Sequence, residues 1–419
     1  MRRSRLESGF GVWLRAMVIV GLSIGLCHGC DITPGELNRY DAAPTVNVAD
    51  LIMIITCIHS KTGKDDKAVT LFYDRQTGCP VGGIDLFMQP EFSEGLTVAR
   101  RDPEGQFGYV DIAGRVVIPF RYYMAWPFHE GRAVVWLKEV RTGQRSYGLI
   151  DRAGQWIVVP GQYEEIGPYR EGRCAFRAGK LWGLLDGIGR VVVPPRFVGG
   201  KPPVFSSAMA AAREQGGRVM YVDKYGRVVV MTPEHTQYAY PFCDGLARIA
   251  VHVHQDNPVL DETSEHHDIF GDLRFGYIAV TGNVVVPPAY TAAGDFSEGL
   301  APVSQTATSM MQDDSSIMMV YELQFGHGSS WGYIDAAGKM AIPFAFERAG
   351  RFSCGLARVR ENGKWGYIDK SGQYVIQPRY EWAWDFRNGV AEVWHEGNIC
   401  FIDRTGNVVV NTGLPAVAF

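Results

Sequence analysis

Histidines and acidic residues gather in one segment of the chain, and such side chains can bind a divalent metal ion. They lie within residues 252–268 and include His252, His254, His266, His267 and Asp268. Imidazole nitrogens and carboxylate oxygens are ligands for Zn²⁺ and similar ions. The spacing matches no established metal motif, and a solvated polar loop accounts for the same composition. Metal binding, or a metal-dependent enzyme, is therefore the alternative function and not the first.

Other chemistry finds little support in the sequence. It contains no His-Glu-x-x-His motif, and none of the six cysteines after Cys30 forms a Cys-x-x-Cys pair. The formal net charge is −4, which argues against a surface that binds nucleic acid. We therefore expect a protein that is not an enzyme, with no cofactor other than a metal ion at the histidine-rich segment.

The first 30 residues have the pattern of an export signal. Arg2, Arg3 and Arg5 precede a short apolar run from Ala16 to Leu26, which is too short to span a bilayer as a mature helix. Gly29 and Cys30 follow, and this pair is similar to the cleavage site of bacterial lipoproteins. We expect an exported protein, periplasmic or on the outer surface, that meets a membrane only through this signal or a lipid anchor at Cys30.

A unit of aromatic residue, Gly, Tyr, Ile and Asp recurs along the rest of the chain. The clearest copies give the motif residues Trp331, Gly332, Tyr333, Asp335, Trp365, Gly366, Tyr367 and Asp369, with Trp182 and Gly183 in an earlier copy. Alternation within the unit predicts a strand with Trp365 and Tyr367 on one face. The following Asp-x-x-Gly predicts a tight turn, and Pro378 is expected to end the next strand.

Each conspicuous residue of the unit has a structural explanation. The repeated aspartates precede x-x-Gly and are expected to form turns rather than a row of acids for catalysis. The Trp and Tyr residues are expected to pack between repeats, although exposed aromatics could also stack on sugars. Gly366 lacks a side chain, so another backbone or ring can approach it closely.

Three parts recur in a fixed order, and together they carry a family resemblance. They are a leading Phe-x-Glu-Gly-Leu, the Gly-Tyr-Ile-Asp core and a closing Val-Ile-Pro or Val-Val-Pro, as in 92–96, 366–369 and 117–119. The chain resembles the WG-repeat family, named for pairs such as Trp365-Gly366. The resemblance implies an all-β tandem array, common in bacterial and often exported proteins. It implies no shared enzymatic activity and no shared catalytic residues.

The organisation that follows is all-β, a tandem array of three-stranded antiparallel meanders. An open β-repeat solenoid is expected, with a propeller-like closed ring as the alternative. About eight units are readable. The domains are a signal (1–30), a linker and N-terminal cap region (31–91), the repeat array (92–412) and a C-terminal tail (413–419).

Two insertions interrupt adjacent units, near 252–274 and 304–330. The second contains Asp313 and Asp314 next to several methionines. Both insertions precede the aromatic-Gly element of their unit, so they should project from one face of the array. We predict one composite binding patch, with His252, His254, His266, His267, Asp268, Asp313 and Asp314 as its candidate residues. The expected function is a non-enzymatic binding or scaffold module for a protein or a cell-envelope polysaccharide.

Overall fold

The computed structural model describes residues 51–58, 67–76, 78, 80–84, 86–88, 92–101, 105–138, 143–252, 273–305 and 330–415. In these residues the chain forms β-strands and no helix, and the strands make antiparallel sheets of three or four strands, none closed into a barrel. No described helix could therefore cross a membrane. The predicted all-β tandem array is confirmed.

The strands are assigned to nine successive sheets. Sheet 1 contains β1 (Leu51–Ile58), β2 (Lys67–Asp74) and β3 (Pro80–Ile84). Sheet 2 contains β4 (Phe87–Met88), β5 (Thr97–Arg100), β6 (Phe107–Val110) and β7 (Val116–Tyr122). Sheet 3 contains β8 (Met124–Ala125), β9 (Arg132–Lys138), β10 (Arg145–Asp151) and β11 (Trp156–Val158). Sheet 4 contains β12 (Glu165–Ile166), β13 (Cys174–Ala178), β14 (Leu181–Leu185) and β15 (Val191–Val198). Sheet 5 contains β16 (Phe205–Ser206), β17 (Met209–Arg213), β18 (Val219–Val222) and β19 (Val228–Met231).

The remaining sheets repeat this pattern. Sheet 6 contains β20 (Thr236–Cys243), β21 (Leu246–His252), β22 (Leu273–Ala279) and β23 (Val284–Tyr290). Sheet 7 contains β24 (Ala292–Ala293), β25 (Leu300–Ser304), β26 (Trp331–Asp335) and β27 (Met340–Phe346). Sheet 8 contains β28 (Arg348–Ser353), β29 (Leu356–Glu361), β30 (Lys364–Ile368) and β31 (Tyr374–Tyr380). Sheet 9 contains β32 (Trp382–Ala383), β33 (Val390–His395), β34 (Asn398–Asp403) and β35 (Val408–Pro415).

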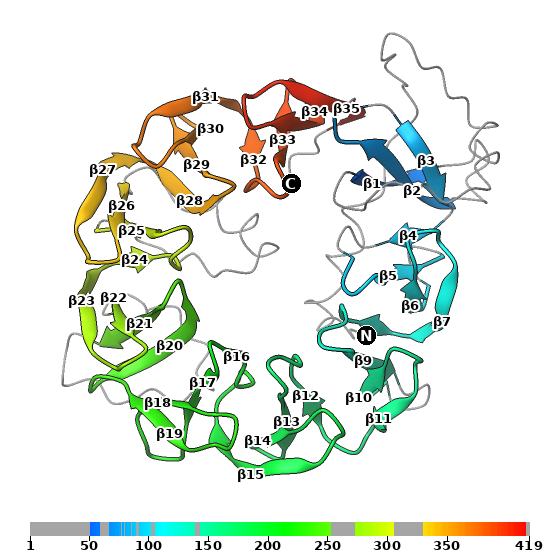
Figure 1. The fold of residues 1–419 in the computed structure, drawn as a ribbon, viewed down its shortest axis with the longest axis vertical. Helices are drawn as coiled ribbons and strands as arrows, with labels where there is room; N and C mark the ends of the chain where they lie inside the picture. Colours follow the sequence, from blue (N-terminus) through cyan, green and yellow to red (C-terminus); the bar gives the residue numbers. More distant parts are fainter. Residues whose placement is uncertain are drawn as a thin grey trace, which may run out of the picture.

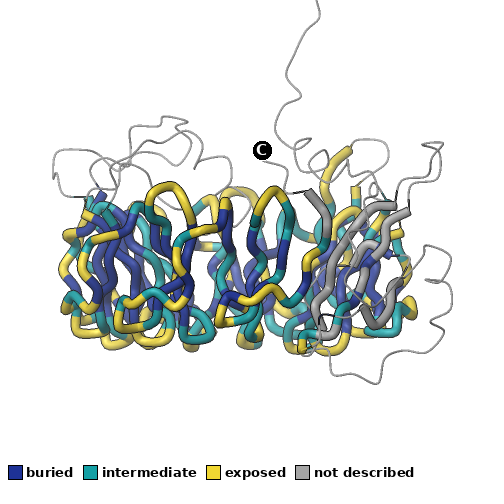
Figure 2. The backbone as a smooth tube through the Cα atoms, turned by 90° about the horizontal axis from the view of Figure 1, so that it is seen from above, coloured by how far each residue is buried: buried dark blue, intermediate teal, exposed yellow. Residues whose placement is uncertain are grey.

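Each of sheets 2 to 9 therefore has one strand more than the predicted meander. The added strand comes first in the sheet and often has only two residues, as in Trp382–Ala383. The fourth strand of each sheet lies on the outer rim of a ring (Figure 1). Seen edge-on, the ring is a flat disc with most exposed residues in turns at its two faces (Figure 2).

The sheets follow one another along a circular path (Figure 1), and none of them closes into a barrel. Between neighbours, the turn glycine Gly372 packs on Ile342 in the outer strand of the preceding sheet, and Gly406 packs on Ile376. Gly78 of sheet 1 lies against the Val409 carbonyl in sheet 9. The first and last sheets are thus in contact, here through backbone.

The repeated aspartates form turns, as predicted. Asp369 Oδ1 accepts hydrogen bonds from the backbone N–H of Ser371 (2.9 Å) and of Gln373 (3.1 Å). Gly372 closes the turn with φ = 85°, a conformation that costs glycine little. Equivalent bonds are made by Asp111, Asp151, Asp186, Asp223, Asp335 and Asp403.

The glycine of the Trp-Gly pair makes room for the next strand. A Cβ added at Gly366 would lie 2.6 Å from the Ile376 oxygen and 2.7 Å from the Pro378 nitrogen. The prediction that Pro378 ends the strand is wrong, because β31 continues to Tyr380. The pairing with β30 is interrupted between Trp365–Tyr380 and Tyr367–Ile376, and an outer strand with no neighbour on its far side tolerates proline there.

The motif aromatics form the core between strands and sheets, as predicted. Trp182, Trp331, Tyr333, Trp365 and Tyr367 are at most 1% exposed. They are therefore unavailable for stacking on an external sugar.

Candidate functional site

The antiparallel connections give the ring two different faces. Turns between first and second strands and between third and fourth strands lie at one end of each sheet, which we call the turn face. Hairpins between second and third strands lie at the opposite end, the hairpin face. In sheet 8 these are the turns at 354–355 and 369–372 and the hairpin at 361–364.

Acidic side chains on the turn face are used to join sheets. Each carboxylate accepts a hydrogen bond from a backbone N–H in the corresponding turn of a neighbouring sheet. The pairs are Glu94–Gly131, Glu130–Gly172, Glu171–Ala208, Asp244–Gly299 and Glu298–Gly355. Their donor–acceptor distances lie between 2.7 and 3.2 Å. The turn face is thus largely committed to holding the ring together.

Both insertions leave the sheets on the hairpin face. The β21–β22 ladder ends at the pair His252–Leu273, and the β25–β26 ladder ends at Ser304–Trp331. These ladders belong to adjacent sheets, so the insertions start from neighbouring sites. This is the placement that the predicted composite patch requires.

The candidate residues of that patch are only partly placed. His252 is half-buried at the last residue of β21. His254, His266, His267, Asp268, Asp313 and Asp314 lie outside the described residues, as do Cys30 and the signal at 1–30. The described part of the chain holds no group of three or more His, Cys, Asp or Glu that could bind a metal ion. The metal site stays a prediction.

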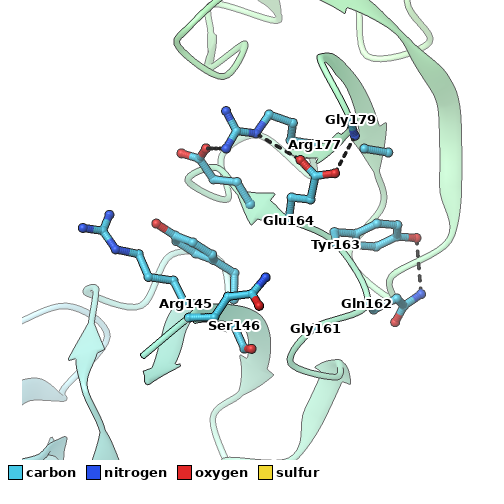
Figure 3. A pocket seen from close by; sticks show the side chains of 12 residues that line it. Arg145, Ser146, Gly161, Gln162, Tyr163, Glu164, Arg177 and Gly179 are labelled. Carbon is cyan, nitrogen blue, oxygen red and sulfur yellow. Dashed lines mark hydrogen bonds and ion pairs between the residues drawn. The ribbon is translucent and has the colours of Figure 1, made fainter. Parts of the chain in front are cut away.

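A cavity of about 600 Å³ opens between sheets 3 and 4 on the hairpin face. One wall is the start of β10, from Gln144 to Tyr147. The other is formed by the connection 161–165 and the β13–β14 hairpin at Arg177 to Gly179. Figure 3 shows Arg145 and Ser146 across the cavity from Arg177 and Gly179. Its volume is within the range of about 300–1,000 Å³ typical of sites for small ligands.

The charged groups of the cavity are held in place by one another (Figure 3). Arg177 lies 3.1 Å from a carboxylate oxygen of Glu165 and 3.9 Å from one of Glu164. Glu164 also accepts a hydrogen bond of 2.8 Å from the Gly179 N–H. These partly exposed ion pairs add little stability, but they fix donors and acceptors around the cavity before a ligand arrives.

Four aromatic rings beside the cavity form what we call the aromatic platform, namely Tyr123, Trp126, Trp136 and Tyr147. The Tyr147 ring, which lines the cavity, lies 6.4 Å from both Trp126 and Trp136 at interplanar angles of 26° and 28°. The Tyr123 ring lies 4.5 Å from that of Trp136. Tyr123 is 47% exposed and Trp126 39%. Tyr123 and Trp126 therefore offer exposed aromatic surface next to a polar cavity.

Cations sit on the same rings. The Lys138 ammonium lies 5.1 Å from the centre of the Tyr123 ring, and the Arg145 guanidinium lies 5.2 Å from that of Trp136. Aromatic faces combined with a few fixed polar groups suit a ligand that has both apolar faces and hydroxyl or carboxylate groups.

This site was missed in the sequence because its residues lie outside the repeated motif. Its one local signal is Trp126. The Tyr109 hydroxyl donates to the carbonyl of Trp126, and the Tyr277 and Tyr333 hydroxyls donate to the carbonyls of Gly294 and Gly350. Glycine stands at this position in sheets 7 and 8, whereas Tyr240 and Trp384 occupy it in sheets 6 and 9 and are half-buried. Trp126 differs from these two aromatic residues in being exposed.

Comparisons with known proteins agree with the repeat and the fold. The family model described as "WG containing repeat" matches residues 107–135, 147–182, 275–306, 331–365 and 365–397. No curated protein matches the chain. Among solved structures, a eukaryotic initiation factor is 9% identical, with 85% of this chain and 94% of that chain covered and a TM-score of 0.50. BamB from Moraxella catarrhalis is 10% identical over 77% of this chain and 94% of that chain, at a TM-score of 0.39. The computationally designed Ika8 protein is 13% identical over 76% and 93%, also at 0.39.

At these identities the structural likeness concerns the fold alone. The initiation factor shares the fold at a TM-score of 0.50 although its sequence is very different. The repeated motif, its matches at five positions and the buried place of its Trp-Gly pairs lead to one assignment. The chain is a WG-repeat protein.

Proposed function

We propose that this protein is a non-enzymatic binding module of the bacterial cell envelope that holds a polysaccharide on its hairpin face. The observation that carries the proposal is the cavity between sheets 3 and 4 together with the aromatic platform beside it. Sugars present apolar C–H faces and hydroxyl edges. The rings of Trp126 and Tyr147 suit the apolar C–H faces of a sugar. The polar groups of Glu164, Arg177 and Gln162 suit its hydroxyl edges.

The two faces of the ring carry different features, and this difference supports a binding role. The turn face carries the same sheet-to-sheet contacts in most units, whereas the hairpin face carries the cavity and both insertions. A rigid scaffold with variable loops on one side is the usual way that such arrays present a binding surface. Export is inferred from residues 1–30, and it would bring the protein to envelope polysaccharides.

Binding can be measured through tryptophan fluorescence and calorimetry. The full chain is titrated with oligosaccharides of three kinds: neutral, N-acetylated and uronic-acid-containing. We expect at least one kind to bind, and binding to fall at least tenfold in a Trp126→Ala, Tyr147→Ala double variant.

The control is Tyr225→Ala, which removes another exposed ring (54%) away from the cavity, in the turn before β19 on the turn face of sheet 5. It should bind sugars like the wild type. No response to any oligosaccharide, or equal binding by the double variant, would contradict the proposal.

A further inference from the structure

Sheet 5 departs from most units at the position of the motif glycine, as sheet 9 does with Cys400. Met220 stands there, followed by Tyr221 and Val222. The outer strand β19 pairs with β18 in consecutive register, with Met220 opposite Met231 and Tyr221 opposite Val230. In sheet 8 the pairing between the third and fourth strands is interrupted at Gly366. In sheet 5 it is not interrupted at Met220, because the Met220 side chain fills the space.

The outer strand of sheet 5 also lacks proline. It reads Val-Val-Val-Met, whereas prolines stand inside the outer strands β7, β15, β23, β27 and β31. Proline on an edge strand removes a hydrogen-bond donor and discourages pairing with another chain. Strand β19 has no such protection on its outward edge, and it lies on the outer rim (Figure 1).

The same strand exposes apolar side chains. Val228, Val229 and Met231 are 45–52% exposed, and Tyr225 in the preceding turn is 54% exposed. Strand β35 likewise has no proline before its last residue. In β35, however, Val409 is half-buried and lies with Tyr73 of sheet 1 in the cluster around Val410, whereas the equivalent Val229 of β19 is 52% exposed. Strand β19 thus combines regular pairing with β18, an outward edge without proline, and exposed apolar side chains.

We propose that β19 is a self-association site, at which two copies of this chain pair their β19 strands antiparallel. In a register centred on Val230, Val229 of one copy lies opposite Met231 of the other on the exposed side. A symmetric contact of this kind uses the same patch twice and needs no second surface.

Charge at the two ends of β19 favours a second copy over other partners. Arg227 precedes the strand with a side chain 75% exposed, and Glu234 follows it with a side chain 77% exposed. Antiparallel pairing brings Arg227 of each copy beside Glu234 of the other, so two favourable contacts form at once. Within one copy, Arg227 pairs with Asp223 and Glu234 pairs with Arg218. Exposed ion pairs of this kind add little stability, so sharing these charges with a second copy costs little.

The contact is small, so the association is expected to be reversible. A four-residue ladder with its flanking turns buries less than the roughly 1,200–2,000 Å² of stable complexes. A monomer at low concentration and a dimer at high concentration follow from this size. The inference does not depend on the proposed sugar site, which lies on another face.

Sedimentation velocity of the full chain over a concentration series tests the proposal. We expect the wild type to approach twice its monomer mass at high concentration, and Val229→Lys to stay monomeric. The matched control is Val375→Lys in β31, a similarly exposed valine (43%) on an outer strand that contains Pro378. It should dimerise like the wild type.

A charge exchange tests the register without an apolar substitution. Arg227→Glu alone should weaken dimerisation at least fivefold, and Arg227→Glu combined with Glu234→Arg should restore it. The proposal is overturned by a wild type that stays monomeric, by equal loss in Val375→Lys, or by no rescue in the exchanged variant. Binding of the monomer to anionic lipid vesicles through Val229 would also overturn it, by assigning the edge to a membrane.

Discussion

The phenolic oxygen of Tyr333 in sheet 7 lies 2.8 Å from the carbonyl oxygen of Gly350 in sheet 8, and the hydroxyl donates a hydrogen bond across the boundary between sheets. Burial raises the pKa of Tyr333 well above its usual range, so the hydroxyl keeps its proton for this bond. The same bond joins Tyr109 to Trp126, Tyr221 to Tyr240, Tyr277 to Gly294 and Tyr367 to Trp384.

Replacing Tyr333 by Phe should destabilise the ring without changing its fold. The variant leaves the buried Gly350 carbonyl without its donor, at a cost of about 1–3 kcal/mol. Urea unfolding followed by fluorescence measures the loss. Tyr225→Phe, at a ring 54% exposed, should change stability by less than about 0.5 kcal/mol. Equal effects of the two variants would show that the inter-sheet bond is unimportant.

Gly366→Ala should destabilise sheet 8 by crowding. The added carbon would lie 2.6 Å from the Ile376 oxygen, which belongs to backbone and cannot move away alone. Overpacking of this kind costs about 1–3 kcal/mol. The comparison is Val375→Ala in β31, which shortens a side chain that is 43% exposed and crowds no neighbour. If thermal unfolding shows no loss of stability in Gly366→Ala, the close approach of the Ile376 backbone to Gly366 is refuted.

The turn aspartates should make stability depend on acid. Hydrogen bonds from the Ser371 hydroxyl and from backbone N–H groups hold the pKa of Asp369 below its usual range, against a small opposing effect of burial. A lowered pKa in the folded state adds stability above the unfolded-state value of about 3.9. That contribution disappears as pH falls through the lower, folded-state value.

Asp369→Asn isolates this effect because asparagine keeps the turn shape but does not titrate. We expect wild type to be the more stable protein at neutral pH and its advantage to shrink below about pH 4. Denaturant unfolding at several pH values gives both curves. A constant difference between the two proteins across this range would exclude Asp369 as a source of acid sensitivity.

Trp126→Ala should separate binding from stability. Its ring is 39% exposed, and the hydrogen bond at this position uses its backbone carbonyl, which the variant keeps. We expect a change in unfolding free energy below about 1 kcal/mol and a loss of sugar affinity of about threefold to tenfold, matching the roughly 0.5–1.5 kcal/mol of an aromatic contact. Loss of stability with unchanged affinity would reverse the roles assigned here.

The parts of the fold that repeat could be predicted from the sequence because each is a local pattern. The turn at Asp369, the space at Gly366 and the buried face of Trp365 and Tyr367 follow from alternation and from glycine placement. The added first strand could not be predicted in this way. Trp382–Ala383 is too short to show an alternating pattern, and its pairing depends on β33.

Ring closure and the candidate site depend on relations between distant residues. The contact of Gly78 with Val409 joins the two ends of the array, and it is set by a small rotation accumulated over all the sheets. The cavity brings together Tyr147 and Glu164 from different sheets, with no motif shared between them. The insertions, by contrast, could be located from sequence, because they interrupt a known period.

The contact between Gly78 and Val409 bears on the order in which the sheets can be linked along the chain. Most boundaries between sheets are made by a turn glycine packed on the preceding outer strand, and Gly78 brings sheet 1 against sheet 9, so the ring does not depend on one particular starting point. The order of the sheets along the chain can therefore be changed without changing their order around the ring. A gene reopened at another hairpin, with the present ends linked, should encode the same ring.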